Sequence, residues 1–397
     1  MVLTASLFNQ LLHHFPRTEF GALVKETKAE RHARGFTCWT QFVAMLFCHL
    51  AHADSLRVIC NGLSCCLGKL KHLGISEAPN KSSLAYANQH RPAALFQKLF
   101  WIALDRFRSQ SMLGASQKPF RFKNKLLLLD STTISLCLSL FPWAQFKKVK
   151  GGVKAHVLLD HDDYMPRFIH FTEASRSDVQ AAHLMPVQRG SIVAMDRAYI
   201  DYELWAKWNT QGVFFVTRLR HDLSIQVVEK RRVPENRNVL EDHLVSLSSQ
   251  QGQRECPFPL RRITVWNDQK QEKIVLLTNH LTFGASTIAD IYRQRWQIEV
   301  FFKTLKQNLK IKTFVGTSEN ALLIQIWTAL LALLLLRWLH CLSKRNWSFS
   351  NLACMLRMNL FTYRDLKDWL TDPFGTPPLE PPSQQLVLEL AQSGQPN

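Results

Sequence analysis

Four polar residues with helical spacing are the first feature of the sequence that could do chemistry. Tyr292, Arg295, Glu299 and Lys306 are separated by three, four and seven residues, so a helix would place them along one face. The apolar residues of this stretch recur on another face, which can pack into a core. A carboxylate between two cations suits a metal ion beside a phosphate. The alternative is an exposed helix with an Arg295–Glu299 pair, worth about 0.2–0.5 kcal/mol.

Two aspartates elsewhere in the chain strengthen the first interpretation. Asp130 follows four consecutive leucines and Asp196 follows the apolar run SIVAM, so each is predicted to end a buried strand. A single aspartate in such a position more often starts a turn. Together with Glu299, however, the two aspartates place three carboxylates on separate elements of one predicted α/β unit.

Carboxylates held close together repel one another, and divalent cations relieve that repulsion. Ligands that offer only oxygen, without His or Cys, select Mg²⁺ or Mn²⁺. Two such ions, roughly 3.5–4 Å apart, can activate an attacking oxygen and stabilise a leaving oxygen during in-line displacement at phosphorus. The predicted substrate is therefore a phosphodiester.

The elements that must position these carboxylates are predicted from hydropathy patterns. Short apolar runs separated by turns predict an antiparallel meander, after which helices and strands alternate, so the predicted fold class is α/β with a mixed sheet. Three β-like pieces, SIQVVEK, LRRITVW and KIVLLTNH, then predict a β-rich insertion at about residues 221–285. The expected strands of the sheet cover residues 125–136, 154–160, 167–174, 191–196 and 213–219.

Helices are predicted on either side of this sheet. Residues 38–60 and 84–107 have helical periodicity, the second opened by the two serines of KSSL as candidate N-caps. The uninterrupted apolar part of residues 321–340 is shorter than the roughly 20 residues that a bilayer needs, so a buried helix is predicted there. Residues 345–370 are expected to be helical, and the proline-rich tail that begins PFGTPP is expected to be disordered.

The charge of the chain favours a polyanionic partner. The 397 residues carry a formal net charge of +18, and 17 Lys or Arg residues against 6 Asp or Glu residues precede Asp130. Nucleic acid and an anionic membrane surface would both attract this charge, and charge alone does not choose between them. The excess before Asp130 indicates a surface for phosphate. The nine cysteines contain no CxxC pair, so no structural zinc site is predicted.

The stretch YRQRWQIEVFFKTLK resembles the defining pattern of the IS4 family of bacterial DDE transposases, which is Tyr, two residues, Arg, three residues, Glu, six residues, Lys. Tyr292, Arg295, Glu299 and Lys306 fill its four positions. LLLLDSTTISL and MDRAYIDYELW resemble the family's segments that contain the first and second catalytic aspartates. The resemblance therefore extends to both strand-end aspartates.

The resemblance implies a ribonuclease-H-like catalytic core that contains the β insertion. In this core, Asp130, Asp196 and Glu299 would bind two Mg²⁺ ions, for which Mn²⁺ can substitute. Outside the core, no segment matches a pattern of DNA recognition well enough to assign contacts. The implied domains are a helical N-terminal DNA-binding domain (1–120), the core (121–320) and a helical C-terminal region with the proline-rich tail (321–397).

The same resemblance implies contacts with DNA around the carboxylates. Tyr292, Arg295 and Lys306 would hold phosphates at the end of the mobile element. Trp296 is assigned to stacking on a displaced base, with a core position as an equal alternative. The basic residues near the core that are also assigned to DNA are Arg197, Arg218, Lys150 and Lys154.

The implied reaction is cut-and-paste movement of an insertion sequence. Water attack at the element's end would free a 3′-OH, which would then attack target DNA; family members commonly form a hairpin at the transposon end. The implied partners are double-stranded DNA, as terminal inverted repeats and target, and a second copy of the chain. The implied location is the bacterial cytoplasm, at the nucleoid, with no membrane partner. Two alternatives stay open: a metal-dependent nuclease without strand transfer, and a DNA-binding derivative that has lost catalysis.

Overall fold

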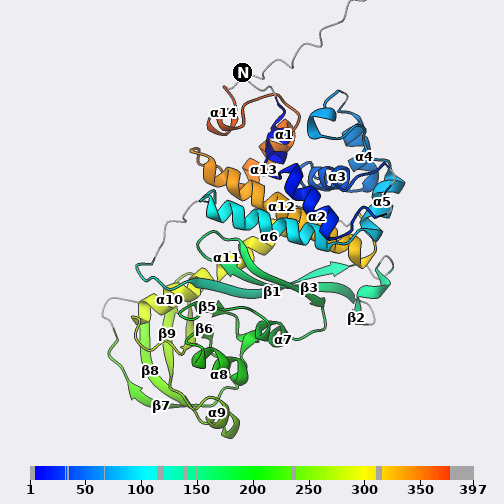
Figure 1. The fold of residues 1–397 in the computed structure, drawn as a ribbon. Coiled ribbons are helices and arrows are strands. Elements are labelled where there is room, and N and C mark those ends of the chain that lie inside the picture. The colour runs from blue at the N-terminus through cyan, green and yellow to red at the C-terminus, as the bar shows by residue number, and fades with distance from the viewer. Residues whose placement is uncertain are drawn as a thin grey trace, which may run out of the picture. The chain divides into compact units, whose positions relative to one another are not determined.

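A computed structural model describes two compact units of the chain (Figure 1). The helical unit comprises Met1–Met112 and Leu323–Asn397, and the sheet unit comprises Leu113–Leu322. The predicted disordered tail lies outside the described residues from residue 376 onward. The described residues are 5–31, 33, 35–66, 68–113, 120–136, 139, 141–147, 150–233, 238–309 and 315–375.

One mixed sheet of ten strands organises the described part of the sheet unit. Its strands are β1 (Leu126–Leu136), β2 (Gln145–Lys147), β3 (Lys150–Asp160), β4 (Pro166–Glu173), β5 (Ile192–Met195), β6 (Phe214–Arg218), β7 (Ile225–Lys230), β8 (Val239–Leu247), β9 (Leu260–Asn267) and β10 (Glu272–Thr278). They lie in the order β2-β3-β1-β5-β6-β10-β9-β8-β7, and β4 also pairs with β3. The mixed α/β fold class is thus confirmed.

The pairing of the first strands follows the predicted meander. β1 pairs antiparallel with β3, and β3 pairs antiparallel with β4. β5 and β6 then add in parallel beside β1. The four leucines that open β1 are buried because that part of the strand is central and both faces of the sheet are covered.

The predicted β insertion extends this same sheet. β10 pairs antiparallel with β6, and β9, β8 and β7 continue outward from it. β8 was not among the predicted strands, because VLEDHLVSL looks polar. Its Asp242 is 3% exposed and is neutralised by Arg261, with 2.6 Å between carboxylate and guanidinium. Because its charged residue is buried as an ion pair, the hydropathy pattern did not identify β8 as a strand.

Helices cover both faces of the sheet (Figure 1). The helices of this unit are α7 (Asp178–His183), α8 (Tyr202–Thr210), α9 (Gln250–Glu255), α10 (Ala285–Gln294) and α11 (Trp296–Asn308). On one face, Leu129 and Met195 pack in a core with Trp205 and Trp208 of α8. α10 contacts β5 and β6, and α11 contacts β1. α7 and α8 separate β4, β5 and β6, which confirms the predicted alternation of helices and strands after the meander.

The helical unit contains shorter helices than the sequence predicts. They are α1 (Leu7–Leu12), α2 (Arg17–Glu26), α3 (Cys38–Leu50), α4 (Leu56–Ser64), α5 (Lys81–His90), α6 (Ala94–Ser109), α13 (Phe349–Asn359) and α14 (Leu366–Thr371). The predicted helix 84–107 is two helices because Pro92 lacks the N–H that a continuous helix needs. Its N-cap is Asn80, whose side chain accepts from the Ser83 N–H at 2.7 Å, and not a serine. Likewise 38–60 divides into α3 and α4.

α12 (Glu319–Leu342) begins in the sheet unit and continues into the helical unit. It is the one helix in the described part of the chain that is long and apolar enough to cross a membrane, but 89% of its most apolar window is buried inside the protein. The prediction of a buried helix is confirmed.

Candidate active site

The alternation of side chains along β1 and β5 brings Asp130 and Asp196 to one face of the sheet. Leu129 and Met195 pair in the parallel ladder and point toward α8. The next residues are Asp130 in β1 and Asp196, which directly follows β5 in extended conformation, so both side chains point toward the face of α10 and α11. β1 confirms the strand predicted over residues 125–136; Asp130 lies within it and not at its end, because β3 keeps pairing with β1 as far as Leu136.

Arg295 joins this face to the helix that follows. Its Nη1 donates to Asp130 Oδ2 at 3.0 Å, and its Nη2 donates to Glu299 Oε1 at 2.6 Å. The guanidinium is 15% exposed. The predicted Arg295–Glu299 pair exists, but it is also anchored to a strand 165 residues away in sequence, which an isolated exposed helix would not provide.

The predicted single helix 292–306 is two helices that meet at Arg295. The Arg295 N–H donates to the Tyr292 carbonyl at 3.0 Å, and the Ile298 N–H donates to the Arg295 carbonyl at 3.1 Å. Both bonds span three residues, which tightens the turn relative to an α-helix. Tyr292 still lies beside Arg295, whose guanidinium is 5.9 Å from the ring centre.

The negative charge of Asp130 is only partly stabilised by its surroundings. Burial raises the pKa of Asp130 to about 6, and the nearby carboxylates of Asp196 and Glu299 act in the same direction. The Ser131 N–H, which donates to Asp130 Oδ1 at 2.8 Å, and the Arg295 guanidinium only partly offset these effects. The site therefore favours an additional cation.

Lys306 and Tyr292 complete the group of predicted residues around Asp130. The Lys306 ammonium donates to the Thr133 carbonyl at 3.0 Å and to the Thr132 hydroxyl. Burial raises the pKa of Tyr292, so its hydroxyl stays protonated as a donor. The predicted residues that the structure brings together are Tyr292, Arg295, Glu299, Lys306, Asp130 and Asp196.

Three further predicted residues lie at the margin of this group. Trp296 begins α11 and is 58% exposed, so the alternative of a core position is wrong. Arg197 directly follows Asp196 and is exposed. Arg218, on β6, has a guanidinium 3.6 Å from the Glu272 carboxylate and a half-exposed side chain.

The ammonium of Lys154, a further predicted DNA contact, already has partners within the sheet unit. Its ammonium lies 3.4 Å from the Asp178 carboxylate and donates to the Arg176 carbonyl at 2.9 Å, and its side chain is 14% exposed. The charge of Lys154 is therefore used inside the sheet unit. The side chain of Lys150 lies outside the part of the chain that the structure describes.

A second polar group behind Asp130 was not predicted. The Ser131 hydroxyl donates to Asp178 Oδ1 at 2.6 Å, and His156 Nδ1 is 3.4 Å from the same oxygen. We name Ser131, His156 and Asp178 the support cluster. The alternation from Asp130 to Ser131 was readable in the sequence, but the register that pairs Ser131 with His156 was not.

A cavity of about 430 Å³ opens beside the acidic residues. Its lining residues are Asp130, Ser131, Thr132, Glu299, Phe302, Lys303, Lys306 and Gln307. A larger cavity of about 660 Å³ lies at the start of α10, beside Arg231 and Arg261, and contains none of the predicted site residues. The smaller cavity places the carboxylates of Asp130 and Glu299 beside the ammonium groups of Lys303 and Lys306, which suit a phosphate.

Comparison with known proteins identifies the family of this chain. Residues 121–335 match the model of the transposase DDE domain, and residues 4–76 match a domain of unknown function. The chain is 32% identical over 293 residues to a putative transposase y4zB of Sinorhizobium fredii, covering 73% of this chain and 80% of the relative.

Two further relatives belong to insertion sequences. The probable transposase for IS5377 of Geobacillus stearothermophilus is 28% identical over 260 residues, 65% of this chain and 67% of the relative. The putative transposase for IS4SA of a Synechocystis species is 22% identical over 270 residues, 66% of this chain and 72% of the relative. The chain therefore belongs to the DDE transposases of bacterial insertion sequences, in the IS4 family.

Proposed function

We propose that Asp130, Asp196 and Glu299 are the catalytic carboxylates of this DNA transposase. Its family catalyses metal-dependent cleavage and transfer of DNA strands. The observation that carries the assignment is the Arg295 guanidinium, which bonds Asp130 and Glu299 at once beside Asp196. Three carboxylates from β1, the end of β5 and α11 thus share one face of the sheet.

These residues fit divalent cations by their donor chemistry. All three offer carboxylate oxygen, and the raised pKa of Asp130 reflects burial first and the nearby carboxylates second, so a bound cation would stabilise its ionised form. No group of three His, Cys, Asp or Glu side chains among the described residues is placed to hold one ion together. Two ions would each need fewer protein ligands: Asp130 and Asp196 would hold one, and Asp130 and Glu299 would hold the other. We therefore propose two Mg²⁺ ions, replaceable by Mn²⁺.

The strand order supports a ribonuclease-H-like core. Three antiparallel strands, β1, β3 and β4, are followed by the parallel strands β5 and β6, with β1 in the centre. The first proposed acid lies on this central strand and the second just after its parallel neighbour. The strands β7 to β10 then form the insertion that precedes α10 and α11.

The cations of the site are proposed to hold the DNA phosphates. Bound divalent ions supply activation of the attacking oxygen and stabilisation of the leaving oxygen. Lys306, at the mouth of the 430 Å³ cavity, would neutralise a neighbouring phosphate, and Tyr292 would donate its hydroxyl proton to another. The exposed indole of Trp296 would stack on a displaced base, while Arg197 and Arg218 would contact the backbone outside.

The proposed reaction is cut-and-paste transposition. Water breaks the phosphodiester bond at the end of the element, leaving a 3′-OH that attacks a phosphodiester of the target and joins the two DNAs. A nuclease with the same metal site would stop after the first step, and a derivative without catalysis would only bind. The relatives are transposases, which favours the complete reaction.

We further propose that the helical unit binds the terminal inverted repeat through α5. Buried hydrogen bonds connect this helix to α3: Gln41 Nε2 donates to Asn88 Oδ1 at 2.8 Å, and Arg91 donates to Gln41 Oε1 at 3.1 Å. No acidic residue occurs between residues 78 and 104. The face of α5 that is exposed to solvent carries Lys81, Ser82, Tyr86, Gln89 and His90.

The composition of this face suits a duplex. Tyr86 is 66% exposed and stacks on His90, with 4.0 Å between ring centres. Glutamine, serine and histidine side chains can donate to and accept from base edges, and lysine can bind phosphate. Replacing Tyr86 and Gln89 with alanine should weaken binding to the element's own end at least about tenfold and binding to unrelated duplex far less. Gln97→Ala, an exposed glutamine on α6, is the matched control.

Pairing of two DNA ends requires two active sites, so we propose a homodimer on DNA, acting in the bacterial cytoplasm at the nucleoid. The test of the whole function uses purified protein, Mg²⁺ and DNA that carries the ends flanking its gene. Wild type should cleave and join these ends, and Glu299→Gln should lose both while still binding them. Glu203→Gln, an exposed acid on α8, is the control that should stay active. Cleavage without joining would indicate the nuclease, and end binding without cleavage would indicate the inactive derivative.

A further inference from the structure

The support cluster lies on the face of the sheet opposite the proposed catalytic carboxylates. Ser131 follows Asp130 in β1, so the two side chains point to opposite faces. Ser131 pairs directly with His156 of β3, and paired residues in an antiparallel ladder share a face. His156 is completely buried. Asp178, at the start of α7, therefore meets Ser131 and His156 behind the strand that carries Asp130.

Asp178 is held in its ionised form by its neighbours. Burial acts against the charge, but His156, the Ser131 hydroxyl and Lys154 together lower the pKa of Asp178 to about 2. An ionised carboxylate is a strong acceptor, and hydrogen bonds to charged groups are worth about 1.5–3 kcal/mol. The 2.6 Å bond from the Ser131 hydroxyl is thus a firm attachment of β1 to α7.

Ser131 connects the two faces through its backbone. Its N–H donates to Asp130 Oδ1 at 2.8 Å, while its hydroxyl donates to Asp178 Oδ1. Fixing the Ser131 side chain fixes the peptide that carries this N–H, and with it one oxygen of Asp130. Because Asp178 bonds the hydroxyl and not Asp130 itself, it can orient the carboxylate without taking part in the chemistry.

We propose that Asp178 is a positioning residue, which orients Asp130 for divalent cations through Ser131. This inference rests on the proposed metal site. Groups that orient metal ligands change metal affinity by about 10–100-fold when removed. Asp178→Asn should therefore raise the Mn²⁺ concentration for half-occupancy about tenfold, with affinity for end DNA changed less than twofold.

The experiment measures Mn²⁺ binding by the free protein, using electron paramagnetic resonance, together with thermal unfolding and binding of end DNA. Asp201→Asn is the control. Like Asp178, Asp201 lies at the start of a helix and beside a histidine: it caps α8, accepting from the Leu204 N–H at 2.8 Å, and lies 3.1 Å from His183. Asp201→Asn should lower thermal stability and leave Mn²⁺ affinity unchanged. Ser131→Ala should weaken Mn²⁺ binding like Asp178→Asn, and Ser131→Thr, which keeps the hydroxyl, should restore it.

The outcomes separate positioning from a purely structural role. If Asp178→Asn and Ser131→Ala lower thermal stability but bind Mn²⁺ like the wild type, the proposal is overturned. Should Asp178→Asn fail to fold, the difference between Ser131→Ala and Ser131→Thr decides alone. Asp130→Asn is measured beside them: if it binds Mn²⁺ as tightly as the wild type, the metal site itself is wrong, whatever the support cluster does.

Discussion

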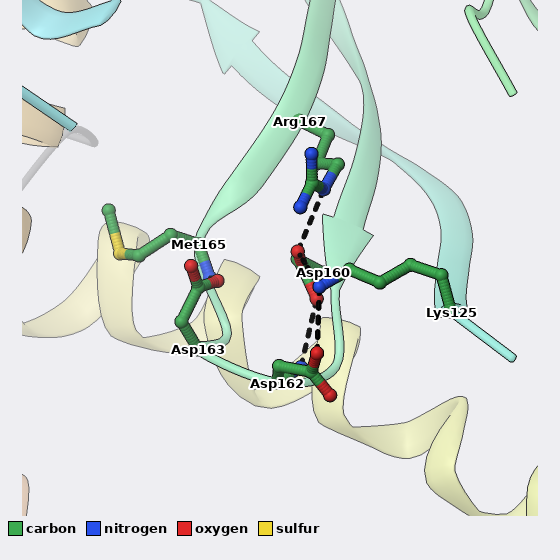
Figure 2. Close-up of polar contacts among 6 residues, drawn as sticks. All are labelled: Lys125, Asp160, Asp162, Asp163, Met165 and Arg167. Atoms are coloured by element: carbon green, nitrogen blue, oxygen red, sulfur yellow. Dashed lines mark hydrogen bonds and ion pairs between the residues drawn. The ribbon is translucent and has the colours of Figure 1, made fainter. Parts of the chain in front are cut away.

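Two aspartates of the sheet unit, the partly buried Asp130 and the buried Asp160, have opposite electrostatic surroundings. Asp160 ends β3 and is 1% exposed, yet Lys125 and Arg167 each lie 2.8 Å from its Oδ2, and the Asp162 N–H donates to its other oxygen at 2.9 Å (Figure 2). Burial alone would raise the pKa of Asp160, but these partners hold it below its usual value. Its charge is satisfied by the protein.

Asp130 has the reverse balance. Burial, with smaller contributions from Asp196 and Glu299, raises its pKa to about 6, and the guanidinium that it shares with Glu299 offsets this only in part. A carboxylate that the protein neutralises stabilises the fold, whereas a carboxylate whose charge is only partly compensated is suited to bind a cation from outside. The turn that follows Asp160 also contacts the helix that leads to Arg295, because the His161 ring lies 3.2 Å from the side chain of Gln294.

The largest difference between the two aspartates is expected in activity. Asp130→Asn should reduce cleavage of end DNA at least about a thousandfold, because it removes a metal ligand shared by both proposed ions. Asp162→Asn, in the Asp160 turn, should cleave within about twofold of wild type. Single-turnover cleavage in Mg²⁺ measures both. Comparable losses in the two variants would erase the distinction between the two regions.

The next largest difference is expected in stability. Asp160→Asn leaves Lys125 and Arg167 facing a neutral group and should lower the free energy of unfolding by about 2–3 kcal/mol. This is less than the about 3–5 kcal/mol of a fully buried pair because both cations reach solvent. Urea unfolding at neutral pH provides the measurement. A variant as stable as wild type would show that the cluster contributes nothing net.

The pH dependence of this effect has a definite sign. The pKa of Asp160 is lowered in the folded state, so its stabilisation is present above its ordinary value of 3.8 and is lost as the pH falls below that value. The gap between wild type and Asp160→Asn should therefore close in acid. A gap that widens on acidification would contradict the assigned cause.

The smallest effect is expected for Asp162, the exposed member of the same turn. Its carboxylate lies 2.7 Å from Lys125, but its side chain is 38% exposed. Exposed pairs contribute about 0–1 kcal/mol, so Asp162→Asn should change the free energy of unfolding by no more than that. Urea unfolding beside Asp160→Asn tests it, and equal losses in both variants would show that burial does not set the contribution of this cluster.

Strand patterns in the sequence were enough to predict that Asp130 and Asp196 would lie near the helix of Glu299. They could not predict that the charge of Asp160, which also ends an apolar run, would be neutralised by the protein. Lys125 and Arg167 come close to Asp160 only when β1, β3 and β4 pair. Apolar runs in the sequence indicate which side chains are buried, but they do not indicate which charged side chains come into contact in the fold.

The other differences between the predicted and the observed structure also arise from contacts that sequence patterns do not reveal. The turn at Arg295 depends on hydrogen bonds between residues three apart, and helical periodicity does not resolve it. Asp178 stands in a polar segment, SRSD, whose relation to Ser131 depends on where α7 packs. Features that depend on local chemistry, such as the break at Pro92, could have been read directly.

The most direct test of the central contrast is the thermal stability of Asp130→Asn without divalent ions. The pKa of Asp130 is raised in the folded state, so the stability of its protonated form is present below 3.8 and is lost as the pH rises through about 6. At about 1.36 kcal/mol per pKa unit, Asp130→Asn should be more stable than wild type by about 1–3 kcal/mol above that range. The difference should shrink as the pH falls toward 3.8.

Melting wild type and Asp130→Asn in EDTA and then in Mg²⁺, at about pH 7.5 and about pH 5, measures both the sign and the cause. The account predicts a higher melting temperature for Asp130→Asn in EDTA at the higher pH, and a Mg²⁺-induced rise in wild type that the variant lacks. A variant less stable than wild type in EDTA, or one that keeps the full Mg²⁺-induced rise, would contradict it.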